Sequence, residues 1–531
     1  MQETQKAGTA KKRISLANVA VLLIVTTLIG QLLGLLRLTL INGKFGPTGD
    51  NSTDVYFAAF TIPDFFFYIV AAGVLGVAFI PVLSDRLAKH DRKGMWEVTS
   101  SVLNLLAVTM LVVGAVIFIF AEPIIRKLYG MEGDRLADTV FIMRCLALSP
   151  LIFTVSGILT AAQQTLGRFF FYAIAPLVYN LSIIASIYIF AGTSMGIKGL
   201  GLGALAGGIL QLLVVMTGLI GTRFVWRPKI MWRSEDFKTV LRQLPPRSLD
   251  QGADQVQTVV ETGIAGRLGE GAISYYNNAV VLMTAPVLLI GSAISTAAFP
   301  RLAARLSQGR PDLFRSDFLR ILRFMIWISI PVVIVSYLAR GYLARIVFKV
   351  GSAEIALIFG LLVAAIFFRV VYAIISRWFY AQKDTKTPLF VSLFTISLNI
   401  ILAIVLSRPT AYGIAGLAMA VSICAAIEVF VLGLIMVLRD RGLLNIEFWG
   451  GVGRAISVGG FSMLAGYAAV STVPLSLDDV GFLVLGGKLA FITLATFSVH
   501  IAISGLFGLD EVRPIFTWLK RIILRPIRGA Y

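Results

Sequence analysis

Cysteine and histidine are both scarce in this chain. Cys145 and Cys424 are its only cysteines, and both lie in apolar stretches, where free thiols behave as small hydrophobic side chains. No disulfide framework is therefore expected. His90 and His500 are the only histidines, and no metal-ligand spacing or nucleophile with a base can be found. These absences argue against an enzyme, and no bound cofactor is expected.

Charged residues are scarce as well. They make up 14% of the 531 residues, whereas hydrophobic residues make up 57%, and the mean hydropathy is +0.86. A soluble domain is about 45–50% apolar, so this composition indicates an integral membrane protein. The 47 lysines and arginines outnumber the 28 acidic residues, but they lie mostly between apolar runs. No RNA-binding motif or Gly-rich phosphate loop accompanies them, so nucleic acid is not expected as a partner.

Long apolar runs dominate what is present. A membrane-spanning helix needs about 20 apolar residues, and about fourteen stretches of the chain meet this length. The seventh, "LDQGADQVQTVVETGIAGRL", is polar enough that it can span only if its polar face lines a cavity or another helix. The predicted spans are centred near Ile29, Tyr68, Met110, Val155, Ser182, Leu210, Val259, Leu288, Ser329, Ala365, Leu398, Ile423, Met463 and Ile492.

The cations of the connections predict the orientation. Cytoplasmic loops carry an excess of lysine and arginine, and with the N-terminus inside that side receives about 30 cations against about ten on the other. We therefore predict a multi-pass membrane protein with both termini in the cytoplasm. The basic residues 509–531 are either an amphipathic segment on anionic lipid or a solvated tail.

The chain also repeats itself at a shift of about 219 residues. "AFIPVLSDRL" at 78–87 matches "AAFPRLAARL" at 297–306, which pairs Pro81 with Pro300, and "AQQ" at 162–164 matches "AQK" at 381–383. Asn180 pairs with Asn399 at the same shift. Each repeat holds six predicted spans, so the two have the same orientation and are related by an axis along the membrane normal.

The predicted fold is thus an all-α polytopic membrane protein of about 14 helices, in two six-helix lobes with two further C-terminal helices. A transporter with its site near the midplane between the lobes is the natural function of this architecture. The predicted parts are a cytoplasmic segment 1–16, an N-lobe 17–222, a basic linker 223–245, a C-lobe 246–440, two spans in 441–508 and a basic tail 509–531.

Polar residues inside the first two spans are candidates for function, because membrane burial makes them costly. Gln31 and Arg37 lie six residues apart, nearly on opposite faces of one helix, and Arg37 is either functional or an interfacial side chain. Asp54 follows "GDNST" at the start of the second span and is a candidate helix cap. Asp64 follows Pro63 and faces either a cavity or a neighbouring helix.

The seventh span carries a stripe of carboxylates. Asp250, Asp254, Gln257 and Glu261 follow the spacing of one helical face and could hold a proton or Na⁺. For Asp250 and Asp254 the alternative is a cytoplasmic amphipathic approach to the span. In the tenth span Arg369 and Arg377 are eight residues apart, near one face. Beyond it, Asp384 either caps the next helix or pairs across a tight turn. Arg144 and Glu428 are isolated charges without an assigned partner.

Three stretches, "TDVYFAAFTIPDFFFYIVAAGVLGVAFIPVLSD", "RWFYAQKDTKTP" and "APLVYNLSII", together resemble the MurJ/MviN family of lipid II flippases, within the superfamily of multidrug and oligosaccharidyl-lipid exporters. The resemblance covers nearly the whole chain. It implies alternating access that carries an undecaprenyl-pyrophosphate-linked peptidoglycan precursor from the inner to the outer leaflet, among membrane lipids, by a protein expected to be a monomer. A cationic cavity would match the pyrophosphate.

The family's first-span pattern "SR.LG..RD" meets "GQLLGLLRL" here, so Gln31 replaces the first arginine, Arg37 keeps the second and Leu38 replaces the acid. Other family charges fall on Phe67 or Tyr68, Ala72 and Val281. The sequence therefore also allows a flippase for another polyprenyl-linked oligosaccharide, or a non-transporting scaffold. The resemblance implies substrate contacts by Arg37, Gln31, Asp54, Asp64, Arg369 and Arg377, and Na⁺ or proton coupling at Glu261, Asp384 and Asp254.

Overall fold

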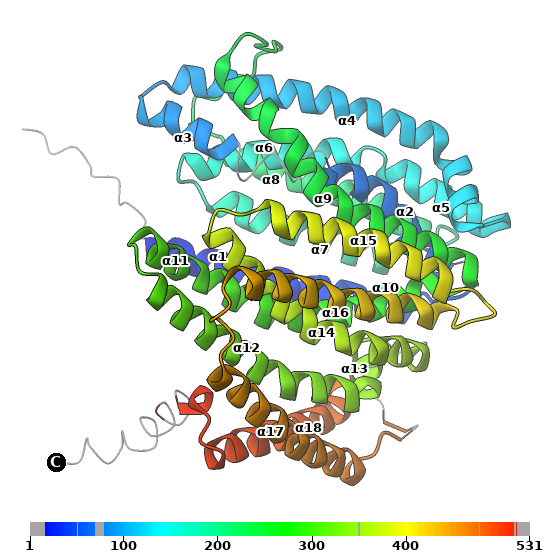
Figure 1. Ribbon diagram of the computed structural model, residues 1–531. Helices are drawn as coiled ribbons and strands as arrows, with labels where there is room; N and C mark the ends of the chain where they lie inside the picture. The colour runs from blue at the N-terminus through cyan, green and yellow to red at the C-terminus, as the bar shows by residue number, and fades with distance from the viewer. Residues whose placement is uncertain are drawn as a thin grey trace, which may run out of the picture. The chain divides into compact units, whose positions relative to one another are not determined.

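The computed structural model describes residues 16–49, 51–69, 79–348, 351–476, 478–479, 481–513 and 517, with the side chains of 16–18, 20 and 243–251 excluded. In this part of the chain the regular structure is helical, and no strand occurs (Figure 1). Nearly all of the predicted N-terminal segment 1–16 and most of the predicted tail 509–531 lie outside the described residues. The predicted all-α fold is confirmed.

The helices follow one another with short connections. Those of the first half are α1 (Leu16–Lys44), α2 (Thr53–Phe67), α3 (Ile80–Ala88), α4 (Arg92–Tyr129), α5 (Gly133–Leu146), α6 (Ser149–Thr165), α7 (Phe170–Phe190), α8 (Lys198–Thr217) and α9 (Glu235–Leu268). Those of the second half are α10 (Ala272–Pro286), α11 (Ala293–Ser307), α12 (Pro311–Leu338), α13 (Arg340–Val347), α14 (Ser352–Ala381), α15 (Lys386–Leu406), α16 (Ile414–Arg439), α17 (Ile446–Thr472) and α18 (Phe482–Leu506). A π-helical turn, Val287–Ser292, joins α10 to α11.

Within the described residues, 12 helices are long and apolar enough to cross a membrane. They account for every predicted span except the second and the seventh. The second falls partly on residues 70–78, outside the described part, and is flanked by α2 and α3. The seventh lies in α9, which is long enough but too polar to meet the same criterion. The count of fourteen therefore stays a prediction.

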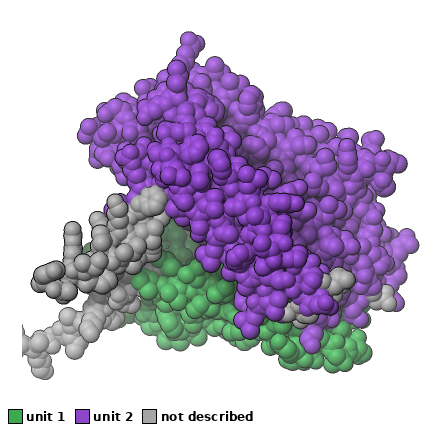
Figure 2. Space-filling model, turned by 90° about the horizontal axis from the view of Figure 1, so that it is seen from below, with its two compact units in different colours: residues 1–41, 62–121, 138–252 green, residues 42–61, 122–137, 253–531 purple. Residues whose placement is uncertain are grey.

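Contacts divide the chain into two compact units, which are coloured in Figure 2. The first comprises residues 1–41, 62–121 and 138–252, and the second comprises 42–61, 122–137 and 253–531. Two short segments from the first half of the chain thus belong to the second unit. The lobe boundaries expected from the sequence, 17–222 and 246–440, stay a prediction.

In the first unit, α7 and α8 pack closely along each other because α8 is rich in glycine. A Cβ at Gly203 would lie 2.1 Å from the Ser186 hydroxyl, so only glycine permits this approach. The loop after α8 and the start of α9 cover an apolar core of the first unit. That core is built on Leu83, Trp96, Val102, Leu159 and Phe237.

In the second unit, α17 and α18 lie side by side and pack on α12. Arg323 of α12 forms an ion pair with Glu511 at 2.6 Å, and a Cβ at Gly451 of α17 would lie 2.8 Å from its guanidinium. Trp327 Nε1 donates to the Ser504 hydroxyl of α18 at 2.8 Å. Polar contacts thus anchor the two C-terminal helices, which lie outside the sequence repeat, to the second unit.

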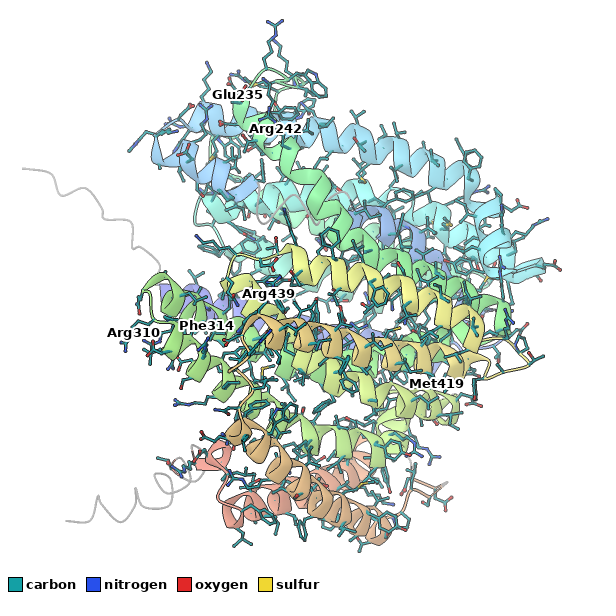
Figure 3. The ribbon with its side chains drawn as sticks, in the orientation of Figure 1. Glu235, Arg242, Arg310, Phe314, Met419 and Arg439 are labelled. Atoms are coloured by element: carbon teal, nitrogen blue, oxygen red, sulfur yellow. The ribbon has the colours of Figure 1, made fainter. Side chains whose placement is uncertain are left out.

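The sequence repeat has a counterpart in the hydrogen bonds. In the first unit, Arg168 Nη1, in the turn between α6 and α7, donates to the carbonyl of Ile220 just beyond α8, at 2.6 Å. In the second unit, Arg439 Nη2, at the end of α16, donates to Thr387 Oγ1 in the first turn of α15, at 2.7 Å (Figure 3). Both pairs are 52 residues apart and are related by the shift of about 219 residues. The same two positions are tied in both halves, with the cation on opposite partners.

Candidate functional site

In the first unit, Arg37 of α1 is a half-buried guanidinium with free donors. It lies over the ring of Tyr179 from α7, with Cζ 6.0 Å from the centroid. Its Nε is buried and has no hydrogen-bond partner among the described residues. The Asp64 carboxylate of α2 lies within electrostatic range but makes no direct ion pair with it. A guanidinium that is stacked but not neutralised can bind a phosphate group through two parallel hydrogen bonds.

The structure thus brings Arg37 and Asp64 into the same region of the first unit. Asp64 is half-buried and directly follows Pro63, as the sequence indicates. Gln31 is exposed, and no polar contact among the described residues joins it to either charge. Its place on another face of α1 follows from the six-residue spacing. Only Arg37 and Asp64 of these three form a common site.

The sequence predicts a substrate contact for Asp54, but the structure gives this residue a different environment in the second unit. Asp54 is fully buried, and its carboxylate accepts hydrogen bonds from the backbone N–H groups of Gly271 and Ser274, each at 2.7 Å. These groups form the first turn of α10, where a negative charge is favourable. Because protein donors occupy both oxygens, Asp54 caps α10 and is not free to bind substrate.

Arg135 of α5 completes this arrangement and was not predicted from the sequence. Its guanidinium lies 3.3 Å from Asp54 and 3.2 Å from Glu270, the residue just before Gly271. One signal was present: the N-cap of α10 is Gly271, which has no side chain for capping and has a φ of +83°. A helix start without a local Ser, Thr, Asp or Asn indicates that the cap comes from elsewhere in the chain.

Glu261 in α9 is the centre of a buried polar cluster in the second unit. Its carboxylate accepts hydrogen bonds from Gln257 Nε2 at 2.7 Å and from the Tyr276 hydroxyl of α10 at 2.8 Å. With its amide turned so that Nδ2 faces the carboxylate, Asn399 of α15 donates at 2.9 Å. Sequence analysis identified Glu261 but missed Tyr276 and Asn399, since neither carries a charge. The cluster therefore satisfies a carboxylate that is otherwise costly to bury.

Arg369 of α14 supplies the positive charge of this cluster. Its guanidinium acts electrostatically on Glu261 and on Glu428 of α16. Glu428 accepts a hydrogen bond from Ser392 Oγ at 2.7 Å. The Nε of Arg369 is buried without a hydrogen-bond partner among the described residues. With both carboxylates ionised, the cluster holds one more negative than positive charge, so it can take up one further cation.

Asp384 does not belong to this cluster, although the resemblance pairs it with Glu261. It precedes α15, about 20 Å along that helix from Asn399 at a rise of 1.5 Å per residue. Its carboxylate accepts hydrogen bonds from Thr387 Oγ1 and from Arg439 Nη1, both at 2.6 Å. Burial alone would raise the pKa of the Asp384 carboxyl, but these hydrogen bonds outweigh it and lower the pKa to about 2. Asp384 is thus an ionised helix cap.

The remaining predicted residues lie around these groups. Asp254 is exposed, two turns before Glu261 in α9, and its charge acts on Glu428. The side chain of Asp250 lies outside the described residues. Arg377 stacks on Phe299 and Tyr380, with Cζ 5.5 Å and 5.7 Å from the ring centroids, and its Nη2 is 3.5 Å from Thr296 Oγ1. Arg377 therefore ties α14 to α11 and is not shared with the Arg369 cluster.

The donor set around Glu261 limits which ion could bind. Among the described residues, no group of three or more histidine, cysteine or acidic side chains could hold a metal ion. One carboxylate, two amide carbonyls and a phenol oxygen are the hard oxygen ligands that Na⁺ accepts, once Gln257 and Asn399 turn their carbonyls inward. The same carboxylate could instead carry a proton. The residues present fit either cation.

Comparison with known proteins places the chain among membrane transporters. The "Probable lipid II flippase MurJ" of Borreliella burgdorferi is 24% identical over 434 residues, covering 80% of this chain and 84% of that protein. The "Lipid II flippase MurJ" of Burkholderia cenocepacia is 26% identical over 448 residues, covering 78% of this chain and 82% of that protein.

Solved structures show the same fold. A lipid II flippase MurJ in an inward closed conformation has a TM-score of 0.76 at 21% identity, covering 93% of this chain and 100% of that one. An inward-facing multidrug resistance transporter of the MATE family has a TM-score of 0.65 at 18% identity, covering 80% of this chain and 98% of that one. The family model described as "Lipid II flippase MurJ" matches residues 41–475, which is most of the chain. This chain therefore belongs to the lipid II flippase MurJ family.

Proposed function

We propose that this protein moves an undecaprenyl-pyrophosphate-linked peptidoglycan precursor, lipid II, from the inner to the outer leaflet of the bacterial inner membrane by alternating access. Membership of the MurJ family and the names of its relatives support this proposal. The observation that carries it is Arg37, a cation within an apolar helix that stacks on Tyr179 and whose buried Nε has no hydrogen-bond partner among the described residues. A charged side chain in a span is costly unless it serves a partner, and a pyrophosphate is such a partner.

The proposed transport requires the protein to bind the pyrophosphate group of its substrate. A pyrophosphate that leaves water loses its hydration, and a guanidinium replaces it with charge-assisted hydrogen bonds. Tyr179 holds the plane of the Arg37 guanidinium by stacking, and Asp64 supplies a carboxylate that competes for it when the substrate has left. Because no bond is made or broken, we include in the proposal that the protein is not an enzyme. We also propose that it acts as a monomer and has both termini in the cytoplasm.

Depletion in the host cell tests the substrate. When the protein is depleted, labelled lipid II should accumulate in the inner leaflet and become inaccessible to an externally added probe. A wild-type copy should restore the outer-leaflet signal, whereas an unrelated membrane protein should not. Unchanged lipid II accessibility combined with loss of another surface glycan would instead favour a flippase for another polyprenyl-linked oligosaccharide. The replacement of the family's first arginine by Gln31 supports this alternative. If no lipid-linked glycan is affected, the scaffold hypothesis is favoured.

We further propose that Glu261 takes up the coupling cation, Na⁺ or a proton, because the cluster of Glu261, Glu428 and Arg369 has one negative charge in excess when both carboxylates are ionised. For a Na⁺ site, the melting temperature of the purified protein should rise with NaCl but not with KCl, and Glu261→Gln should abolish this difference. For a proton site, the salts should act alike, and the pH dependence of transport should disappear in Glu261→Gln. The exposed Glu354→Gln is the matched control. Wild-type transport by Glu261→Gln at every pH, without a Na⁺ effect, contradicts the proposal.

A further inference from the structure

The linker between α8 and α9, residues 218–234, is held against α4 by a row of polar side chains. Asn104 is the centre of this row: its Oδ1 accepts from Trp226 Nε1 at 2.8 Å, and its Nδ2 donates to the carbonyl of Arg227 at 2.6 Å. Ser100 and Ser101 accept from linker N–H groups, and Glu97 pairs with the Arg227 guanidinium at 2.6 Å. The linker therefore has a fixed conformation in the first unit.

The linker exposes large apolar side chains in spite of this. Phe224 and Ile230 turn inward onto the apolar core beneath. Trp226 and Trp232 remain 54% and 56% exposed, and the neighbouring Val225 and Met231 are also exposed. The linker thus buries Phe224 and Ile230 but leaves both of its tryptophan side chains exposed on its outer face. In water such a patch is unfavourable, and it indicates a binding surface.

The same outer face is positively charged. Arg223, Lys229 and Arg233 are exposed and have no acidic partner among the described residues. No aspartate or glutamate occurs from 218 to 234. The next acids along the chain, Glu235 and Asp236 at the start of α9, are already paired with Lys238 and Arg86, and Glu97 of α4 is paired with Arg227 (Glu235 is labelled in Figure 3). The surface thus combines indole rings with unneutralised cations.

The depth of the linker along α4 is also defined. Asn104 is the last polar residue of α4 before the run "LLAVTMLVVGAVIFIF", residues 105–120. This run is apolar except for Thr109. The linker is bound where the hydrocarbon-compatible part of α4 begins. Trp at this level, with Lys and Arg beside it, is the arrangement found at membrane–water interfaces.

We propose that the linker surface formed by Arg223, Val225, Trp226, Lys229, Met231, Trp232 and Arg233 binds anionic phospholipid headgroups, with its indoles inserted into the interface of the bilayer. The leaflet follows from the proposed orientation and is the cytoplasmic one. The surface would hold that end of the first unit at a fixed depth in the membrane. This site is separate from Arg37 and Glu261 and does not depend on what the protein transports.

Depth is tested on the full-length chain with Cys145 and Cys424 replaced by alanine. An environment-sensitive fluorophore is attached to Trp232→Cys, and quenching is measured in nanodiscs that contain lipids spin-labelled at the headgroup or along the acyl chain. We expect strong quenching by headgroup and shallow labels. The control is Lys93→Cys, which is exposed in the first turn of α4. It lies about 16 Å farther along the helix from the apolar run than Asn104 does, so its fluorophore should be quenched weakly. A fluorophore at 232 that no lipid label quenches overturns the proposal and leaves a protein partner.

Charge is tested with the triple variant Arg223→Gln, Lys229→Gln, Arg233→Gln. Phosphatidylglycerol, but not phosphatidylcholine, should raise the melting temperature of the wild-type protein in micelles, and added salt should weaken the effect. At about 1 kcal/mol for each surface cation, the variant should bind phosphatidylglycerol about 100-fold more weakly. The matched control changes three exposed cations elsewhere to Gln and should retain the effect: Lys44 at the end of α1, Lys127 near the end of α4 and Arg408 between α15 and α16. Equal stabilisation of the triple variant and the wild type would refute the role of the linker cations.

Discussion

Replacing Asp54 by alanine is expected to destabilise the protein more than any other single change discussed here. The substitution removes the acceptor of two backbone N–H groups at the start of α10 and the buried partner of Arg135. Breaking a buried ion pair costs about 3–5 kcal/mol. The lower end of this range is expected here, because Arg135 keeps Glu270 as a partner. The apparent melting temperature and the midpoint of denaturant unfolding of the purified protein in detergent should both fall.

Two further variants separate capping from a general effect of losing an acid. Asp54→Asn keeps an oxygen for the helix N–H groups but removes the charge opposite Arg135, so it should lie between wild type and Asp54→Ala. Asp134→Ala removes an exposed acid beside Arg135 and should leave stability unchanged. A melting temperature of Asp54→Ala equal to that of wild type would show that α10 does not need this cap.

Replacing Arg37 by alanine is expected to abolish transport while leaving folding intact. Among the described residues, Arg37 makes no hydrogen bond through Nε and no direct ion pair with Asp64, so the folded protein loses the stacking contact with Tyr179 and a longer-range attraction to Asp64. That contact is worth about 0.5–2 kcal/mol. The substrate, in contrast, would lose the charge that replaces its hydration. Complementation of a depleted host should fail, although the variant reaches the membrane in normal amounts.

The controls for Arg37 are another arginine and a conservative change. Arg144→Ala removes an exposed arginine in the same unit, which rests on Phe118, and should complement. Arg37→Lys keeps the charge but loses bidentate geometry, so partial activity is expected. Full complementation by Arg37→Ala would rule out both flippase hypotheses as formulated here and would favour a scaffold.

The arrangement of helices could be predicted largely from the sequence, because the bilayer imposes a length and a composition on each span. Each of the 12 apolar helices contains one predicted span centre. Of the two predicted spans outside these helices, the seventh is instructive: it lies in α9, a continuous helix whose apolar content is too low for the criterion. Its deepest acid, Glu261, is buried by protein donors, which is the condition under which a polar segment can cross a membrane.

The candidate sites could be predicted only in part, because sequence shows which residues are unusual but not what they meet. Glu261 and Arg369 were identified as charges within spans, yet their common cluster depends on Tyr276 and Asn399 from two other helices. Asp54 was expected to cap the start of the second span, but the helix that its carboxylate caps begins more than 200 residues later in the chain. Such distant pairings leave no local pattern in a single sequence.

For Asp384, in contrast, the neighbouring residues alone were sufficient to predict its role. Its hydrogen bonds to the N–H groups of Lys386 and Thr387 are those of an ordinary helix cap, one of the alternatives that the sequence allowed. The resemblance to a family with a Na⁺ site suggested a second role for the same residue. The ion pair with Arg439 leaves its carboxylate no open position for another cation.

Each half of the chain contains a hydrogen bond between the same two repeat positions, but the arginine occupies a different one of the two positions in each half. This difference affects which substitutions each contact tolerates. In the first half Arg168 bonds to a peptide carbonyl, and every amino acid at position 220 supplies one. Position 220 can therefore drift freely while the tie persists. In the second half Arg439 bonds to the side chains of Asp384 and Thr387, so a change at one of these positions requires a compensating change at another. Contacts at equivalent positions of the two repeats thus place different constraints on substitution: the first tolerates single changes, whereas the second requires coordinated ones.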